Sequence, residues 1–284
     1  MQHVAHVRRP EAAAAEAAIE VSGLSHVYAG ADGGVPALEN ISLCVASGRF
    51  TVIVGPSGCG KTSLLMMLAG LRRPSAGTIL CHARPIADPD PERVGVVFQE
   101  ASLFPWLSAL DNIEFPLALR GTPREDRARR SAAMLSLVGL DGFGERYPHE
   151  LSGGMKQRVS IARGLVQDPP VLLMDEPFAA LDEQTRMTMG HELLRIWSAT
   201  EKTVVFVTHS LTEAVYLGQR IAVFTARPGR IKAEIRNDLP RPRRIGTPDF
   251  STLVDTLWNQ LKEESLIAIK REKVEHDEIA LPKE

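Results

Sequence analysis

Residues 55–62 read GPSGCGKT, in which two glycines flank four residues and are followed by Lys61 and Thr62. This is the pattern of a phosphate-binding loop. Glycines let successive backbone N–H groups point at phosphate oxygens, and the N-terminus of a following helix favours the same anions. In such a loop Lys61 reaches the β and γ phosphates of a nucleotide, and the Thr62 hydroxyl ligates Mg²⁺. An accidental glycine-rich turn is the alternative, but the strand-like run before the loop and the helical pattern after it favour phosphate binding. The expected nucleotide contacts are Gly55, Pro56, Ser57, Gly58, Cys59, Gly60, Lys61, Thr62 and Ser63.

A second segment, VLLMDE at residues 171–176, reads as an apolar strand that ends in two carboxylates. At the C-terminal edge of a parallel sheet, Asp175 would lie beside the phosphate loop and hold Mg²⁺ through water. The adjacent Glu176 suits a general base that polarises an attacking water. Many buried strands end in an acidic residue, so this segment gains its meaning only beside the phosphate loop.

A third segment, LSGGMKQ at residues 151–157, places the hydroxyl of Ser152 and the free backbone of Gly153 and Gly154 at the start of a helix. That arrangement is a second anion-binding site, although an ordinary helix N-cap is the simpler interpretation. Together with the phosphate loop and the strand carboxylates, in this order, it makes residues 19–231 resemble the ABC ATPase family, whose signature sequence it matches.

The resemblance implies roles for four further residues. Gln99 matches the glutamine that senses the metal and links to a membrane partner. The expected metal site thus consists of Thr62, Gln99 and Asp175. Asp182, in Ala-Leu-Asp, matches the loop that crosses the interface between two ATPase subunits. His209 matches a histidine that contacts the γ-phosphate, and Tyr28 an aromatic that stacks on adenine. Without the resemblance, a strand-end histidine or an early tyrosine is more often core or surface filler.

The elements that must position these residues follow from the apolar pattern. Short runs joined by turns predict antiparallel strands over residues 19–50, and 72–91 is turn-rich. Further along, apolar strands alternate with segments of helical periodicity, which is typical of a mostly parallel α/β sheet. The expected strands are 50–55, 93–99, 171–176 and 203–209, and the expected helices are 61–71, 123–138, 155–165, 182–200 and 210–220. With the resemblance, this predicts a P-loop NTPase of the ABC ATPase type, which has an N-terminal antiparallel β subdomain and an inserted α-helical subdomain.

The chain divides into three predicted parts. Residues 1–18 form a flexible N-terminal extension that lacks the features of a signal peptide. Residues 19–239 form the ATPase domain, with the helical subdomain at about 100–162. Residues 240–284 form a C-terminal extension with one helix, at 250–273, and a disordered tail. The stripe expected on that helix is Leu253, Leu257, Leu261 and Leu266.

The composition excludes several classes of function. Of the 284 residues, 44% are hydrophobic and 24% are charged, and the net charge of −2 gives no basic excess for nucleic acid. No apolar run approaches the roughly 18–20 residues needed to span a bilayer. Three cysteines without a Cys-x-x-Cys pair indicate reduced thiols in the cytosol.

One phosphate loop and one signature in the chain have a mechanical consequence under the resemblance. In ABC ATPases the signature of one subunit covers the ATP held by another, so two chains are needed, most simply two copies of this one. The alternative is a soluble ABC ATPase that acts on DNA or another non-transport partner. Relatives of that kind carry a long coiled coil between the two catalytic segments. Here Lys61 and Asp175 are only 114 residues apart (175 − 61), without sustained heptads, so a transporter is favoured.

Three stretches, 94–117, 175–186 and 225–231, most resemble the ATPases of nitrate, sulfonate and taurine importers. The partners this implies are a second ATPase subunit, two transmembrane permease subunits and, indirectly, a solute-binding protein, at the cytoplasmic face of the inner membrane. Phe104, Pro105 and Trp106 are expected where a permease helix docks, although ordinary packing also explains Trp106. Ala179 replaces the glycine usual in this group. The group also serves vitamin precursors, so the solute stays open.

Overall fold

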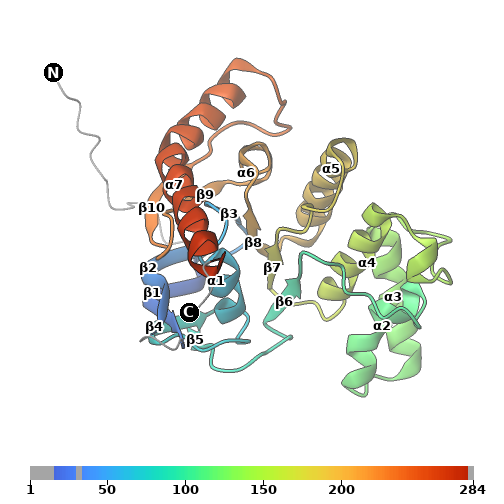
Figure 1. The fold of residues 1–284 in the computed structure, drawn as a ribbon. Helices are drawn as coiled ribbons and strands as arrows, with labels where there is room; N and C mark the ends of the chain where they lie inside the picture. The colour runs from blue at the N-terminus through green and yellow to red at the C-terminus, as the bar shows by residue number, and fades with distance from the viewer. Residues whose placement is uncertain (1–15, 30–33, 281–284) are drawn as a thin grey trace.

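The computed structural model describes residues 16–29 and 34–280, with only the backbone of 272–280 described. These residues form a four-stranded sheet of order β2-β1-β4-β5 and a six-stranded sheet of order β10-β9-β3-β8-β7-β6 (Figure 1). The strands are β1 (Ala17–Tyr28), β2 (Val35–Ala46), β3 (Phe50–Val54), β4 (Ala76–Cys81), β5 (Arg84–Pro85), β6 (Val94–Val97), β7 (Val171–Asp175), β8 (Thr203–Thr208), β9 (Arg220–Phe224) and β10 (Ile231–Arg236). The helices are α1 (Lys61–Leu68), α2 (Ala109–Leu119), α3 (Arg124–Leu137), the 3₁₀ turn η1 (Pro148–Glu150), α4 (Gly153–Leu165), α5 (Glu183–Thr200), α6 (Leu211–Leu217) and α7 (Pro248–Ala280).

The six-stranded sheet is the core that carries the phosphate loop. Its strand β3 lies between β8 and β9 and pairs with both in parallel, while β10 alone among the described strands of this sheet pairs antiparallel. All five residues of β3 and of β7 are buried, as expected for strands covered on both faces. The predicted α/β fold with a mostly parallel core sheet is therefore confirmed.

The N-terminal sheet is antiparallel, as predicted, but it contains two strands that the sequence did not suggest. Strands β4 and β5 fall inside the stretch 72–91, for which the sequence predicts turns. In β4 only Ile79 and Cys81 are buried and the first three residues are exposed, so the strand has no long apolar run. Strand β1 begins at Ala17, and the predicted extension 1–18 thus overlaps it by two residues; residues 1–15 lie outside the described part of the chain.

The helical subdomain stands to one side of the core sheet (Figure 1). Its helices α2, α3 and α4 pack on one another, and α4 also contacts β6. One apolar cluster runs from this subdomain into the core sheet and includes Ile113, Leu135 and Val159 with Phe206 and Val223. The signature segment is therefore attached to the sheet through a continuous core.

Beyond β8 the chain departs from the prediction in two places. The expected helix 210–220 ends at Leu217, because the backbone of Gly218 is extended. A Cβ at Gly218 would meet Val52 at 2.8 Å, so the close packing at this helix end requires glycine. The chain then forms β9 and β10, neither of which was predicted. The C-terminal helix α7 is longer than expected; Leu257 and Leu261 are buried on it as predicted, but Leu266 is exposed.

Helix α7 packs against α6 and β9. It also forms one wall of a cavity whose other wall is Gly55, Pro56, Ser57 and His209. None of the helices described between residues 16 and 280 is long and apolar enough to cross a membrane.

Candidate active site

The phosphate loop connects the end of β3 to the first residue of α1, so its shape is set by a buried strand and a helix N-terminus. Gly58 and Gly60 have φ angles of +69° and +101°, in the left-handed region that favours glycine. A Cβ on Gly60 would also lie 2.7 Å from Leu38 Cδ2 and 2.9 Å from the Ala37 carbonyl oxygen. The backbone conformation at both positions and the close packing at Gly60 therefore require glycine. The helix N-terminus that follows favours an anion.

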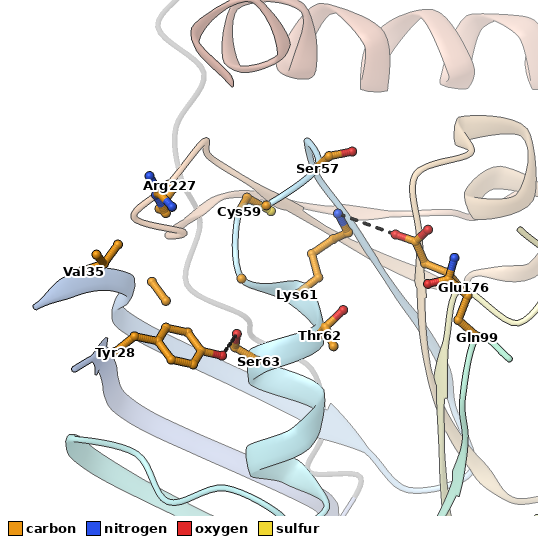
Figure 2. A pocket seen from close by; sticks show the side chains of 13 residues that line it. Tyr28, Val35, Ser57, Cys59, Lys61, Thr62, Ser63, Gln99, Glu176 and Arg227 are labelled. Carbon is orange, nitrogen blue, oxygen red and sulfur yellow. Dashed lines mark hydrogen bonds and ion pairs between the residues drawn. The ribbon is translucent and has the colours of Figure 1, made fainter. Parts of the chain in front are cut away.

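Lys61 is buried at the first position of α1, and its ammonium group closes the loop. Its Nζ donates hydrogen bonds to the carbonyl oxygens of Gly55 and Pro56, both at 2.9 Å. The same atom lies 3.9 Å from Glu176 Oε1. This buried positive charge faces the cavity that the loop encloses (Figure 2).

Asp175 and Glu176 are adjacent in sequence but serve different neighbours. The Thr62 hydroxyl donates to Asp175 Oδ1 at 3.2 Å. Burial raises the pKa of Asp175, and the hydrogen bond from Thr62 opposes that shift. Glu176 contacts Lys61 and His209 instead of Thr62. Its backbone φ of +43° is left-handed, a conformation that costs a non-glycine residue about 1–3 kcal/mol.

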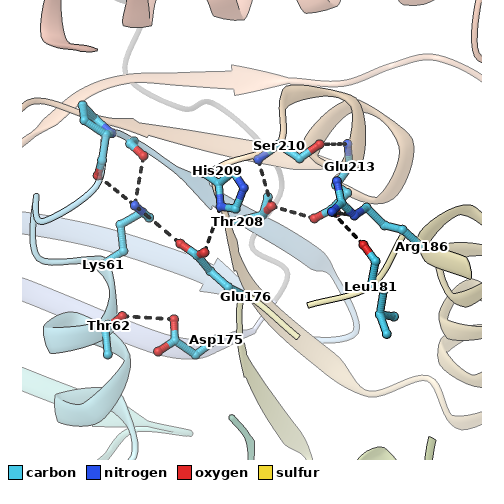
Figure 3. Close-up of polar contacts among 12 residues, drawn as sticks. Lys61, Thr62, Asp175, Glu176, Leu181, Arg186, Thr208, His209, Ser210 and Glu213 are labelled. Carbon is cyan, nitrogen blue, oxygen red and sulfur yellow. Dashed lines mark hydrogen bonds and ion pairs between the residues drawn. The ribbon is translucent and has the colours of Figure 1, made fainter. Parts of the chain in front are cut away.

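The carboxylate of Glu176 lies between a lysine and a histidine (Figure 3). Its Oε2 is 2.8 Å from His209 Nδ1, and its backbone N–H donates to the Val207 carbonyl at 2.9 Å. His209 follows β8 directly, so two neighbouring strands, β7 and β8, bring the pair together. A carboxylate held by a histidine and close to a lysine is suited to orient a water molecule and to accept its proton.

The phosphate loop forms one end of a cavity of about 270 Å³, and Gln99 and Glu176 border the same space (Figure 2). Tyr28 lines the other end, and its hydroxyl is 2.7 Å from Ser63 Oγ. The predicted residues that line this cavity are Tyr28, Ser57, Gly58, Cys59, Gly60, Lys61, Thr62, Ser63, Gln99 and Glu176. Gln99 is exposed and follows β6, which ends at Val97 rather than at the glutamine as expected. Gly55 and Pro56 line the neighbouring cavity under α7.

The thiol of Cys59 is buried, although the residue borders the phosphate cavity. The residue is 1% exposed, and a Cβ on Gly55 would meet its Sγ at 2.9 Å, so the sulfur packs inside the fold. Burial raises the pKa of the Cys59 thiol, which keeps it protonated. Only the backbone of Cys59 is left to face an anion.

The signature residues lie apart from the phosphate cavity. Ser152 caps α4 by accepting a hydrogen bond from Met155 N at 3.3 Å, and Gly153 is the first helical residue. Ser152 and Gly154 line a separate cavity of about 460 Å³, and among the described residues none borders both this cavity and the phosphate cavity. Asp182 caps α5, next to the second cavity, by accepting from Thr185 N at 2.9 Å.

Comparison with known proteins assigns this arrangement to a family. A family model described as ABC transporter matches residues 38–179, half of the chain. An uncharacterized ABC transporter ATP-binding protein of Methanocaldococcus jannaschii is 47% identical over 252 residues, which cover 89% of this chain and 94% of that protein. The chain belongs to the ABC transporter ATP-binding family. Other relatives of this ABC ATPase are the nitrate import ATP-binding protein NrtD of Synechocystis (46% identical, 78% of this chain, 83% of that one) and the aliphatic sulfonates import ATP-binding protein SsuB of Bacillus cereus (41%, 88% and 98%).

Solved structures of ATP-binding cassettes agree with the fold. A dimeric cassette in a post-hydrolysis state, bound to ADP and Pi, superposes with a TM-score of 0.68 at 32% identity; it covers 78% of this chain and all of that one. A dimeric bacterial ABC transporter cassette gives a TM-score of 0.69 at the same identity and coverage. The ABC ATPase described here binds and hydrolyses ATP.

Three residues that line the phosphate cavity of this ABC ATPase were not predicted: Val35, Ala37 and Arg227. Val35, at the start of β2, and Arg227, between β9 and β10, both line the end of the cavity that holds Tyr28. Arg227 lies within the stretch 225–231 that carried part of the resemblance, which was the one signal available. Nothing in the local sequence distinguishes Val35 or Ala37.

Proposed function

We propose that this ABC ATPase works as two copies inside an importer. In this arrangement each ATP lies between the phosphate loop of one copy and Ser152–Gly154 of the other. The observation that carries the proposal is the division of the anion-binding features of one chain between two cavities without a common residue. Donors on both sides of the γ-phosphate then require a second chain.

The proposed chemistry is the transfer of the γ-phosphoryl group from ATP to water, which yields ADP and phosphate. Glu176 accepts the proton of the attacking water, and His209 holds the Glu176 carboxylate and contacts the γ-phosphate. Lys61 stabilises the negative charge that develops on the transferred group. Tyr28 stacks on adenine at the far end of the cavity, and Asp182 meets the second copy.

Thr62, Gln99 and Asp175 are the residues that we propose for Mg²⁺. Their side chains offer hydroxyl, amide and carboxylate oxygens, the donor types that this ion prefers. Among the described residues no cluster of three or more His, Cys, Asp or Glu could hold a metal, so the protein would supply one buried carboxylate and leave the remaining positions to phosphate oxygens and water. When bound, the ion neutralises charge on the β and γ phosphates.

The proposed partners are two transmembrane permease subunits at the cytoplasmic face of the inner membrane and, through them, a solute-binding protein. The aromatic group at Phe104 and Trp106 supports the docking of a permease helix: their rings are 5.5 Å apart, and Trp106 is 70% exposed. The relatives named for nitrate and aliphatic sulfonates support a small oxyanion such as nitrate, a sulfonate or taurine as the solute. No role with nucleic acid is proposed.

The two-copy arrangement is tested with mixed dimers. One chain carries Lys61→Ala, the other carries Ser152→Arg, and different affinity tags isolate the assembly that holds one of each. If the motifs act between chains, one site carries both lesions and the other is intact, so hydrolysis persists in the mixed dimer but not in either variant alone. If both sites are inactive, cysteines at Ser57 and Ser152 decide the question. A disulfide that forms only within one chain in the presence of ATP would refute the proposal.

A further inference from the structure

Arg186 and Glu213 form an ion pair between the two helices that follow Asp182 and His209. Arg186 lies on α5, four residues after Asp182, and Glu213 lies on α6, four residues after His209. The distance from Arg186 Nε to Glu213 Oε1 is 3.4 Å, which is long for a hydrogen bond, and the Nε has no other hydrogen-bond partner. The pair therefore joins α5 to α6 through charge rather than through one well-directed hydrogen bond.

Each member of the pair also contacts the segment that precedes its own helix (Figure 3). Arg186 Nη2 donates to the carbonyl oxygen of Leu181 at 3.0 Å. Glu213 Oε2 accepts from the Thr208 hydroxyl at 2.6 Å, and the Thr208 oxygen accepts from the backbone N–H of Ser210 at 3.0 Å. The residues on both sides of His209 are thus fixed by Glu213, directly or through one hydroxyl.

The position of the pair is costly for a charge. The side chain of Glu213 is 13% exposed and that of Arg186 is 31% exposed, and both line a cavity of about 330 Å³ that is bordered by Phe178 and Tyr216. Burial raises the pKa of Glu213, while the positive charge of Arg186 opposes that shift. Partly buried ion pairs contribute little net stability because desolvation offsets their attraction. A role other than stability is therefore the better explanation for this pair.

We propose that Arg186 and Glu213 are positioning residues for ATP hydrolysis, which hold the segment Leu181–Asp182 and His209 in one fixed relative arrangement. The contacts run without a break from the Leu181 carbonyl through Arg186, Glu213 and Thr208 to the backbone around His209, whose ring holds Glu176. A displacement of Leu181–Asp182 by a second copy is then transmitted to the histidine beside the candidate general base. The inference rests on the proposed function, because it assumes that His209 and Glu176 act in hydrolysis.

The first experiment separates positioning from stability. Glu213→Gln, Arg186→Met and the double variant are compared in the purified full-length chain by steady-state hydrolysis and by urea unfolding. A misplacement of about 1 Å can cost about 10²-fold in rate, so each single variant should lower kcat by about 10- to 100-fold while the KM for ATP stays within about twofold. The double variant leaves no unpaired charge and should recover the unfolding free energy, but not kcat. If kcat recovers together with stability, the pair has only a structural role and the proposal is overturned.

A matched control is available in the helical subdomain. Arg127 and Glu114 form an ion pair at 2.7 Å with side chains 23% and 20% exposed, remote from the loops described above. Glu114→Gln should change stability by an amount similar to Glu213→Gln and leave kcat unaltered. An equal fall in kcat in this control would show that any lost ion pair lowers activity, and would refute a specific role for Glu213.

The second experiment asks whether Glu213 acts through His209. In a double-mutant cycle, Glu213→Gln should lower kcat in the wild-type background but cause no further fall in a His209→Ala background. The same fall in both backgrounds would show that Glu213 acts independently and would overturn the proposal. The mixed-dimer experiment alters neither residue, so its failure would remove the composite site while the result of this cycle would stand.

Discussion

Gly229 lies against the phosphate loop, and its replacement by alanine should weaken ATP binding without touching a predicted ligand contact. Its backbone N–H donates to the Ala37 carbonyl at 2.8 Å, and its carbonyl accepts from Glu39 N at 3.0 Å, so two hydrogen bonds fix its place. A Cβ on Gly229 would lie only 2.1 Å from the carbonyl oxygen of Cys59 in the loop. Its φ is outside the left-handed region, so the effect of Gly229→Ala would be steric.

The size of the effect follows from that contact. Real Cβ atoms do not approach other atoms within 3.0 Å, so Gly229 and the Cys59 carbonyl must separate by about 0.9 Å, from 2.1 to 3.0 Å. Both groups belong to the backbone, and no change of rotamer can relieve the clash. Overpacking of this kind costs about 1–3 kcal/mol. If most of this energetic cost falls on the ATP-bound state of the loop, the affinity for ATP falls by about 10- to 100-fold.

The measurement is a titration with a fluorescent ATP analogue, combined with urea unfolding. Gly190→Ala is the control, because a Cβ there meets Tyr216 at an ordinary 3.4 Å in the middle of α5. Because this contact causes no clash near the phosphate loop, the affinity of Gly190→Ala for ATP should be unaltered. Helix propensity predicts that its unfolding free energy is equal to that of the wild type or higher by up to about 1 kcal/mol. Wild-type affinity and stability in Gly229→Ala would refute the reasoning, since the Cys59 carbonyl would then be free to move at no cost.

Three further predictions concern the site itself. Glu176→Gln should retain ATP affinity and lower turnover by about 10²-fold or more, with ATP-bound dimers accumulating in gel filtration; near-normal turnover would remove Glu176 as the base. Labelling of Cys59 with a maleimide should be slow with or without Mg-ATP, whereas the exposed Cys44 reacts; rapid labelling of Cys59 in peptide maps would contradict its burial. Because burial raises the pKa of Glu213 above 4.5, the folded chain takes up this proton at a higher pH than the unfolded chain, and the unfolding free energy of the wild type should rise relative to Glu213→Gln as the pH falls from 7 towards 4.5. A difference in the opposite direction in urea unfolding would contradict that pKa shift.

Much of the phosphate site could be predicted because its geometry is local. GPSGCGKT is contiguous, and a buried strand before it with a helix after it leaves few ways for the backbone to run. Asp175 and Glu176 end another fully buried strand, and parallel strands bring their carboxyl ends to one edge. The separation of Ser152 from the phosphate loop needed the structure, since sequence order does not give distance across the fold.

The parts that were missed depend on tertiary packing. Strand β10 alternates between half-buried and exposed residues and has no apolar run, so its pairing with β9 supplies its only distinguishing feature. Arg186 and Glu213 read in the sequence as ordinary charges in the first turns of two helices, and their pairing arises only when α5 packs against α6. Gly229 looked like part of a loop, while its lack of a side chain matters because Cys59, 170 residues earlier, passes beside it.

The place of β3 between β8 and β9 also constrains the order in which a growing chain can assemble on the ribosome. Strand β1 finds both β2 and β4 within about 60 residues, whereas Phe50 on β3 pairs with Val204, about 150 residues later. Contacts between such distant segments form late in folding. A nascent chain that has not yet reached β8 therefore carries an apolar strand, Phe50–Val54, without its neighbours, and such strands attract chaperones and other chains. The candidate ATP-binding loop, which follows β3, therefore gains its full support from β8 and β9 only late in synthesis.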